Sequence, residues 1–167
     1  ILTDVPCSGE GMFRKDEVAV QEWSIENVDT CWQRQRRILR DIWPCLKTGG
    51  LLIYSTCTYN REENEDNVAW IAQELGAEIL PLETQPDWHI TGNLTGTEFP
   101  VYRFLPHKTT GEGLFMAVLR KTADEPAVSV RTKTGGKASK KGKGGKVVVL
   151  QVPKEMKAWV QGAGDYV

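Results

Sequence analysis

The sequence predicts an α/β fold built on a mostly parallel sheet. Two apolar, strand-like runs begin about fifty positions apart, at Ile1 and Leu51, and a helix-patterned stretch separates them. This is the spacing of a strand–helix–strand unit. The first run is followed closely by Cys7, and the second by Cys57. Ligands of parallel α/β sheets bind outside the carboxyl ends of the strands, so we expect both thiols to meet at one catalytic edge.

The first strand is expected at residues 1–5, followed by a loop rich in Gly and Ser. Ser24 then begins a long helix that ends at Thr48-Gly49-Gly50, a typical glycine stop. The apolar positions of this helix form a near-heptad stripe on one face, at Ile25, Val28, Trp32, Leu39, Ile42 and Leu46. The second strand, residues 51–55, is apolar almost throughout, as expected for a strand covered on both faces.

The second half of the predicted sheet follows another helix. Asn60 and Glu63 have the spacing of a capping box, so this helix is expected from Asn60 to about Leu75. A third parallel strand is expected at 77–82, before a long polar surface loop. An antiparallel strand at 113–119 is expected to insert beside the parallel strands and to pair with 101–105, because a turn rather than a crossover helix precedes it.

Charge divides the chain into unlike parts. Residues 1–122 carry 12 Lys and Arg against 18 Asp and Glu, a net charge of −6, whereas residues 123–167 carry 9 against 4, a net charge of +5. Seven of the 16 residues from Arg131 to Lys146 are cationic. We therefore expect a basic disordered linker at 123–146, either a solvated tether or a non-specific phosphate contact. Residues 147–167 are expected to begin a truncated C-terminal accessory domain.

Composition also bears on the class of protein. The chain has no secretory signal pattern, and no apolar run approaches the roughly 20 residues that span a bilayer. It begins inside a predicted strand, so we expect a fragment of a cytoplasmic protein. The four cysteines form no C-x-x-C pair and lie far in sequence from both histidines. We therefore expect reduced thiols and no metal site.

Cys57 is a candidate nucleophile. The thiolate is the attacking species, and a nearby helix N-terminus or cation lowers the pKa of the thiol. Cys57 lies three residues before the expected helix start at Asn60, and Arg14 and Lys15 follow the first strand. All three features are expected to lower its pKa. A buried, inert strand-end cysteine explains the same position equally well on these grounds alone.

Asp4 and Pro6 precede Cys7 in a pattern suited to recognising a base. The Asp4 carboxyl can hydrogen-bond a ring nitrogen, and the Pro6 carbonyl can accept from an exocyclic amino group. Gly9 and Gly11 are expected to let the backbone approach a planar ligand. The bare D-x-P-C pattern is moderately specific, and a second strand ending in Thr-Cys-Thr strengthens it.

Three stretches of the sequence stand out together: Asp4-Val-Pro-Cys-Ser-Gly-Glu-Gly-Met-Phe-Arg14, Ser55–Thr58 with Glu62–Glu65, and Arg103–Lys108 followed by Gly111–Ala117. They resemble motifs of the NOL/NOP/Sun family of S-adenosylmethionine-dependent RNA cytosine-5 methyltransferases, in particular its bacterial RsmB/RsmF type. The resemblance covers residues 1–121. It implies that residues 1–122 form the C-terminal half of a class I, Rossmann-like methyltransferase domain, with S-adenosylmethionine as cofactor and RNA, expected to be ribosomal, as substrate.

The resemblance also implies residue roles. Cys57 would add to C6 of the target cytosine, Cys7 would assist release of the methylated product, and Asp4 would lie between methyl donor and base and contact both. The target base must leave its stack to enter such a pocket. RNA contacts are expected from the segment after the first strand, at Pro6, Arg14 and Lys15.

The sequence departs from the family in its cofactor motifs. The Gly-rich motif for the methionine end of the cofactor and the acidic residue for its ribose do not occur in it, so we expect a fragment that is inactive alone. Two alternatives stay open. A DNA cytosine-5 methyltransferase would use Cys7 as nucleophile and leave Thr56-Cys57-Thr58 without a purpose. A non-catalytic RNA-binding scaffold would not need both thiols and Asp4.

Overall fold

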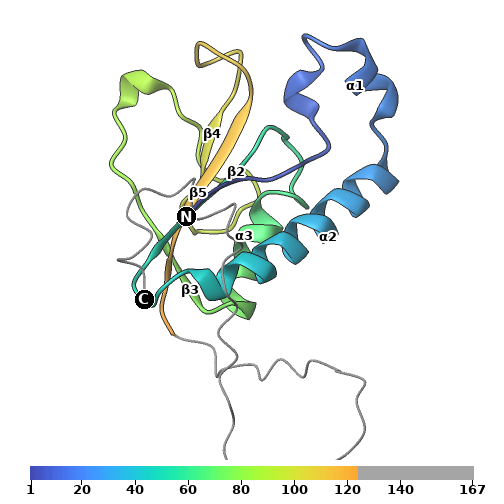
Figure 1. The fold of residues 1–167 in the computed structure, drawn as a ribbon. Helices are drawn as coiled ribbons and strands as arrows, with labels where there is room; N and C mark the ends of the chain where they lie inside the picture. Colours follow the sequence, from blue (N-terminus) through green and yellow to red (C-terminus); the bar gives the residue numbers. More distant parts are fainter. Residues whose placement is uncertain (124–167) are drawn as a thin grey trace, which may run out of the picture. The chain divides into compact units, whose positions relative to one another are not determined.

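The sheet and its helices are seen in a computed structural model that describes residues 1–123 (Figure 1). The predicted linker and accessory domain lie outside the described residues, apart from position 123. The strand order is β1-β2-β5-β3, and β4 also pairs with β5. The strands are β1 (Leu2–Asp4), β2 (Leu51–Thr56), β3 (Ala77–Leu80), β4 (Tyr102–Phe104) and β5 (Leu114–Lys121).

Strand direction confirms the predicted mixed sheet. β1 pairs with β2 in parallel, whereas β5 is antiparallel to β2, β3 and β4. β1 to β4 therefore share one direction, and β5 inserts between β2 and β3 with the opposite one. β3 and β4 lie end to end on one flank of β5, with Leu80 opposite Val118 and Tyr102 opposite Met116.

The long helix α2 (Ile25–Ile42) begins where the sequence predicts. The Ser24 side-chain oxygen accepts the amide of Asn27 at 3.1 Å, which caps the helix. The predicted end at Gly49-Gly50 is wrong, because the α-helix stops at Ile42 and a 3-10 turn, η2 (Trp43–Cys45), follows. Pro44 has no N–H to continue the α-helical bonding. The predicted inward stripe also fails at Ile25, which is 70% exposed.

The loop predicted after the first strand contains two short elements that sequence patterns do not reveal. They are the 3-10 turn η1 (Glu10–Met12) and the helix α1 (Glu17–Glu22). Asp16 caps α1 by accepting the amide of Val18 at 2.9 Å. No residue of α1 is buried. A helix without a core-facing side has no apolar periodicity to detect.

The helix after β2 starts later than predicted. Residues 61–64 form turns, and α3 (Glu65–Glu74) begins after Asn64. Asn60 and Glu63 make one of the two contacts of a capping box, because the Glu63 amide donates to Asn60 Oδ1 at 2.9 Å. The Glu63 carboxylate accepts from the Asn60 side chain at 2.8 Å, whereas the Asn60 amide donates to Glu10. These contacts therefore close the turn that precedes the helix.

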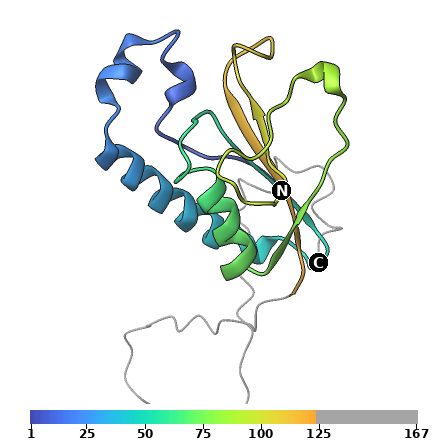
Figure 2. The same ribbon diagram turned by 180° about the vertical axis from the view of Figure 1, so that it is seen from behind.

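The core lies between the sheet and the two longer helices, which cover the same face of it in both views (Figure 1 and Figure 2). Trp43, Tyr54 and Phe115 are its largest buried rings. Tyr54 and Phe115 meet edge to face, with ring centroids 6.4 Å apart. The buried ammonium of Lys121 donates to the carbonyls of Trp43 and Leu46 at 3.3 and 2.9 Å, where the chain leaves α2. This packing holds the end of α2 against β5.

The opposite face of the sheet is more open among residues 1–123. Leu2 is 70% exposed and Leu51 45% exposed, so the expectation that β2 is covered on both faces is not met at its start. Within the same residues, no helix has the length and apolar character required to cross a membrane.

Candidate active site

The two cysteines meet at the carboxyl ends of β1 and β2. Asp4 and Ser55 are partners in the parallel register, so the two strands end at nearly the same level. Cys57 follows β2 directly, and Cys7 lies three residues beyond β1. Their sulfur atoms are 3.1 Å apart and share a thiol hydrogen bond. The structure thus brings together the two thiols as predicted from their spacing.

The hydrogen bond makes the two thiols unequal. It lowers the pKa of Cys57 to about 7, against the opposing effect of burial. The same hydrogen bond, followed by burial, raises the pKa of Cys7. The directions of the two pKa shifts favour ionisation at Cys57, although either sulfur can be the donor in the hydrogen bond. A thiolate at Cys57 is the reactive form of the pair.

The cause of this pKa shift differs from the predicted one. The N-terminus of α3 lies at Glu65, eight residues after Cys57, because the helix starts later than expected. The Lys15 ammonium lies 3.0 Å from a carboxylate oxygen of Glu112 in an exposed ion pair. Arg14 lowers the pKa of Tyr59, whose overall rise comes first from burial. The partner thiol, rather than a helix dipole or a cation, is the main cause at Cys57.

Asp4 and Pro6 are both exposed beside the thiols. Asp4 Oδ1 accepts the hydroxyl of Ser55 at 3.2 Å, which leaves most of its acceptor capacity for a ligand. The Pro6 carbonyl accepts Gln35 Nε2 at 3.0 Å. A carbonyl oxygen has two lone pairs, so this bond leaves one for a further donor.

Glu63 ties the two cysteine loops together, a role that sequence reasoning did not assign. Its side chain is fully buried. Its carboxylate accepts the amide of Ser8 at 3.3 and 3.1 Å, Gln35 Nε2 at 2.6 Å and Asn60 Nδ2 at 2.8 Å. Ser8 adjoins Cys7, whereas Asn60 belongs to the loop after Cys57. One carboxylate therefore sets the position of both loops relative to α2.

Gly11 also differs from its predicted role. Its amide donates to the Cys57 carbonyl at 2.7 Å, and a Cβ at this position would lie 2.5 Å from that oxygen. Glycine thus permits a close approach between two protein loops rather than the approach of a planar ligand. The neighbouring Glu10 carboxylate accepts the amides of Tyr59 and Asn60 at 2.6 and 2.9 Å, which fixes the same loops from outside.

A buried ion pair supports the loop after Cys57 from β4. Arg103 donates from Nε and Nη2 to the two carboxylate oxygens of Glu65, at 3.0 and 2.5 Å. The Arg103 and Glu65 side chains are 3% and 1% exposed. Arg103 Nη1 also donates to the Tyr59 carbonyl at 3.0 Å. The Arg103–Lys108 motif thus contributes a structural clamp.

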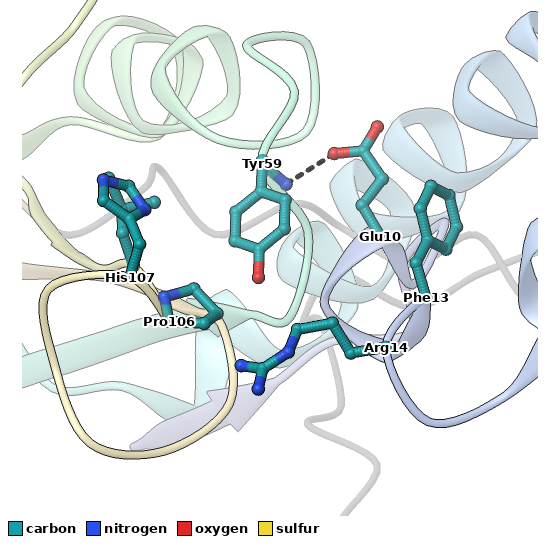
Figure 3. Close-up of a pocket in the computed structure, with 7 residues that line it drawn as sticks. Glu10, Phe13, Arg14, Tyr59, Pro106 and His107 are labelled. Atoms are coloured by element: carbon teal, nitrogen blue, oxygen red, sulfur yellow. Dashed lines mark hydrogen bonds between the residues drawn. The ribbon is translucent and has the colours of Figure 1, made fainter.

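A cavity of about 680 Å³ opens next to this loop. Figure 3 shows Tyr59 between the chain that carries Pro106 and His107 and the chain that carries Glu10 and Phe13, with Arg14 extending toward Pro106. The cavity is lined by Glu10, Phe13, Arg14, Tyr59, Leu105, Pro106 and His107. Of the predicted RNA contacts, Arg14 faces this cavity.

The sequence resembles a family model and several known proteins that are named as ribosomal RNA methyltransferases. Residues 1–120 match the model of the family described as 16S rRNA methyltransferase RsmB/F. The ribosomal RNA small subunit methyltransferase F of Vibrio cholerae is 32% identical over 171 residues, which cover 96% of this chain and 36% of the relative. Its counterpart from Escherichia coli O157:H7 is 41% identical over 130 residues, which cover 77% of this chain and 26% of the relative.

The fold is also similar to that of a solved structure. The crystal structure of NSun6 from Pyrococcus horikoshii with SFG has a TM-score of 0.61 and 31% identity, over 74% of this chain and 30% of that one. The chain spans about a third of the length of the Vibrio relative and about a quarter of the Escherichia relative. On sequence and structure together, the chain belongs to the 16S rRNA methyltransferase RsmB/F family.

Proposed function

We propose that this chain carries the nucleophile and the base-binding edge of a methyltransferase that modifies C5 of a cytosine in ribosomal RNA. The observation that carries the proposal is the pair of thiols, 3.1 Å apart, at the ends of two adjacent parallel strands. The names of the relatives support RNA of the small ribosomal subunit as substrate. The resemblance to RNA cytosine-5 methyltransferases implies the chemistry at C5, and the two thiols are the groups that it requires.

In the proposed reaction, Cys57 attacks the base. The Cys57 thiolate uses an electron pair to form a bond to C6 of the cytosine, and the π electrons of the C5–C6 bond become available at C5. C5 would then take the methyl carbon, whose bond to the sulfonium sulfur of the cofactor would break with its electron pair on that sulfur. Splitting one difficult step into two easier ones is the general benefit of covalent catalysis. A pKa of about 7 leaves a large fraction of Cys57 as thiolate near neutral pH.

Cys7 serves the release step in this proposal. After methylation, the proton on C5 leaves to water, the C5–C6 double bond forms again, and the S–C6 bond breaks with its electrons on Cys57. A thiolate leaves faster when its pKa is lower. The hydrogen bond with Cys7 lowers the pKa of Cys57, so it favours departure of the same sulfur.

Among residues 1–123, Asp4 has the chemistry to contact the cofactor. When bound, S-adenosylmethionine supplies an electrophilic methyl group. The Asp4 carboxylate is exposed at the end of β1 and has acceptor capacity beyond its bond from Ser55, as a cationic ligand with N–H and O–H donors requires. In the proposal, Asp4 holds the base on one side and the methyl donor on the other.

The test compares two cysteine variants of the full-length protein with small-subunit ribosomal RNA. Cys57→Ala should abolish both methyl transfer and covalent protein–RNA adducts, because no thiolate remains to attack C6. Cys7→Ala should still form the adduct but release it slowly, so that adduct accumulates on denaturing gels. The exposed Cys45, at the opposite end of β2, provides the control variant Cys45→Ala, which should behave as wild type.

The opposite pattern would reverse the assignment. If Cys57→Ala accumulates adduct and Cys7→Ala does not form it, Cys7 is the nucleophile, as in the DNA-type alternative. If neither variant changes methyl transfer, the thiols are not catalytic and the binding-scaffold alternative gains support.

A further inference from the structure

We propose that the cavity of Figure 3 is a subsite for the nucleotide next to the target cytosine in the RNA strand. The base of that nucleotide would rest against the aromatic and apolar wall, and its phosphate would lie at Arg14. We call this cavity, with the seven lining residues given above, the flanking pocket. The inference rests on the proposed function, because it takes Cys57 as the point at which the target base is held.

The flanking pocket adjoins the nucleophile without containing it. Tyr59, in its wall, lies two residues after Cys57, and the Gly11 amide joins the loop of Phe13 and Arg14 to the Cys57 carbonyl at 2.7 Å. Neither Cys7 nor Cys57 lines the pocket. A base in the pocket is therefore not placed for attack, whereas the next base along the strand can reach the thiolate.

The wall of the pocket has the chemistry that stacks bases. Phe13 and Tyr59 offer two rings, and Leu105 and Pro106 complete an apolar surface. The rings of Trp23 and Phe13 form a T-shaped pair with centroids 6.5 Å apart, which supports the Phe13 ring. Aromatic stacking accepts any base, because every base has a π face. The pocket therefore suits a neighbouring nucleotide and should show little selectivity for its base.

The ring of Tyr59 is held in place. Arg103 Nη1 donates to its carbonyl, the Glu10 carboxylate accepts its amide, and its hydroxyl lies in the space that a side chain at Gly113 would occupy. With its backbone fixed on two sides and its hydroxyl packed against Gly113, the Tyr59 side chain has little conformational entropy left to lose when a base stacks on its ring. This favours Tyr59 as the stacking surface.

The charge available in the pocket is positive. The Glu10 carboxylate accepts N–H groups from Tyr59, Asn60 and the Trp23 indole, so its charge is directed at these donors. Figure 3 shows the bond from the Tyr59 amide. Arg14 is exposed and pairs with no carboxylate among residues 1–123. A polar cavity of about 410 Å³ shares Arg14 and His107 and continues along Lys108 to Gly111. Cationic side chains that have no acidic partner can bind the phosphates of an RNA backbone whose bases stack on the neighbouring aromatic wall.

The test measures equilibrium binding of RNA to the full-length protein without cofactor. The probe is a short fluorescein-labelled oligouridylate with one central cytosine, and two further probes lack the base on the 5′ or the 3′ side of that cytosine. One abasic probe should bind about tenfold more weakly than the intact probe, the scale of one lost base–aromatic stack. The other abasic probe should bind with nearly wild-type affinity.

Variants of the pocket close a thermodynamic cycle. Tyr59→Leu should weaken binding of the intact probe by about tenfold. This variant should bind the intact and the abasic probes with equal affinity, because the stacking contact is already lost. Phe13→Leu, at a more exposed position, gives the same test if thermal melting shows that Tyr59→Leu does not fold. Arg14→Ala should weaken binding of all probes alike and reduce the slope of log K against log salt by about one.

Lys47→Ala is the matched control for charge. Lys47 is an exposed cation before the start of β2, at the opposite end of that strand from Cys57, and its removal should change binding by less than about twofold. The inference is overturned if neither abasic probe binds more weakly than the intact probe. It is also overturned if the loss of RNA affinity from Tyr59→Leu and the loss from the missing base are additive. A third contrary result would be that Tyr59→Leu weakens binding of S-adenosylmethionine and leaves RNA binding unchanged.

Failure of the proposed function would look different. In that case the wild-type protein would show the abasic penalty and its suppression by Tyr59→Leu, yet would transfer no methyl group to cytosine. Conversely, loss of the subsite alone would leave cytosine methylation and the Cys57 adduct intact, with no response to a missing neighbouring base.

Discussion

The amide of Ser8 donates to both carboxylate oxygens of Glu63, at 3.3 and 3.1 Å. The two residues are 55 positions apart in sequence, yet this contact holds the loop of one cysteine against the turn that follows the other. A buried carboxylate without a cationic partner is stable only when donors surround it. Here the donors are amides of the chain itself, so the geometry of the thiols depends on Glu63.

Glu63→Gln should therefore alter both stability and thiol chemistry. In either orientation, the new side-chain amide meets a donor, Gln35 Nε2 or Asn60 Nδ2, and we expect a loss of about 1–3 kcal/mol in the free energy of unfolding. A looser Cys7 loop weakens the hydrogen bond to Cys57. That bond is the largest influence on the pKa of Cys57, and it lowers the pKa. The charge of Glu63 raises the pKa by a smaller effect, so the net result of Glu63→Gln should be a higher pKa of Cys57.

Urea unfolding and the pH dependence of Cys57 alkylation measure these two effects. The exposed Glu74, at the end of α3, is the control, and Glu74→Gln should change neither. A Glu63→Gln protein that is less stable but has an unchanged Cys57 pKa would show that Glu63 supports the fold without positioning the thiols.

The reactivity of Cys57 should follow its lowered pKa. Only the thiolate is alkylated, so the rate of its reaction with iodoacetamide should rise with pH and reach half its maximum near pH 7. In Cys7→Ala the hydrogen bond is lost, and the midpoint should move upward toward the ordinary range of a cysteine thiol. Mass spectrometry of the alkylated peptide assigns the step to Cys57. A midpoint that stays near 7 in Cys7→Ala would mean that another group lowers the pKa.

The buried pair Arg103–Glu65 and the exposed pair Arg120–Glu78 should differ sharply in their contribution to stability. Arg103→Met leaves Glu65 buried and unpaired, so we expect a loss of about 3–5 kcal/mol in the free energy of unfolding. Arg120→Met breaks a pair with Glu78 whose side chains are 48% and 55% exposed, and its cost should lie within about 1 kcal/mol. Equal losses in chemical denaturation would contradict the structural role given to Arg103.

The sequence could predict the parts of this fold that depend on local pattern. The meeting of Cys7 and Cys57 follows from strand–helix–strand spacing, and the insertion of β5 follows from the turn before it. The start of α3 could not be predicted in the same way. Asn60 and Glu63 have capping-box spacing, but Glu63 is drawn into contacts with Ser8 and Gln35, and the helix begins only afterwards.

Long-range polar contacts were the main information that the sequence did not contain. Gln35 is 28 positions from Glu63, and Arg103 is 38 positions from Glu65. Neither pair has a periodic or local signature. The cause of the Cys57 pKa shift was missed for the same reason, since the responsible thiol is 50 positions away.

The place of β5 in the sheet has a consequence for protein synthesis. β5 is the last described strand to leave the ribosome, yet it lies between β2 and β3 and also pairs with β4. Until Leu114–Lys121 emerges, β2 has only β1 as a partner, and β3 and β4 have no strand to pair with among residues 1–123. Pairings between segments so distant in sequence form slowly. Strand edges on the nascent chain therefore stay open to wrong partners until this final segment closes the sheet.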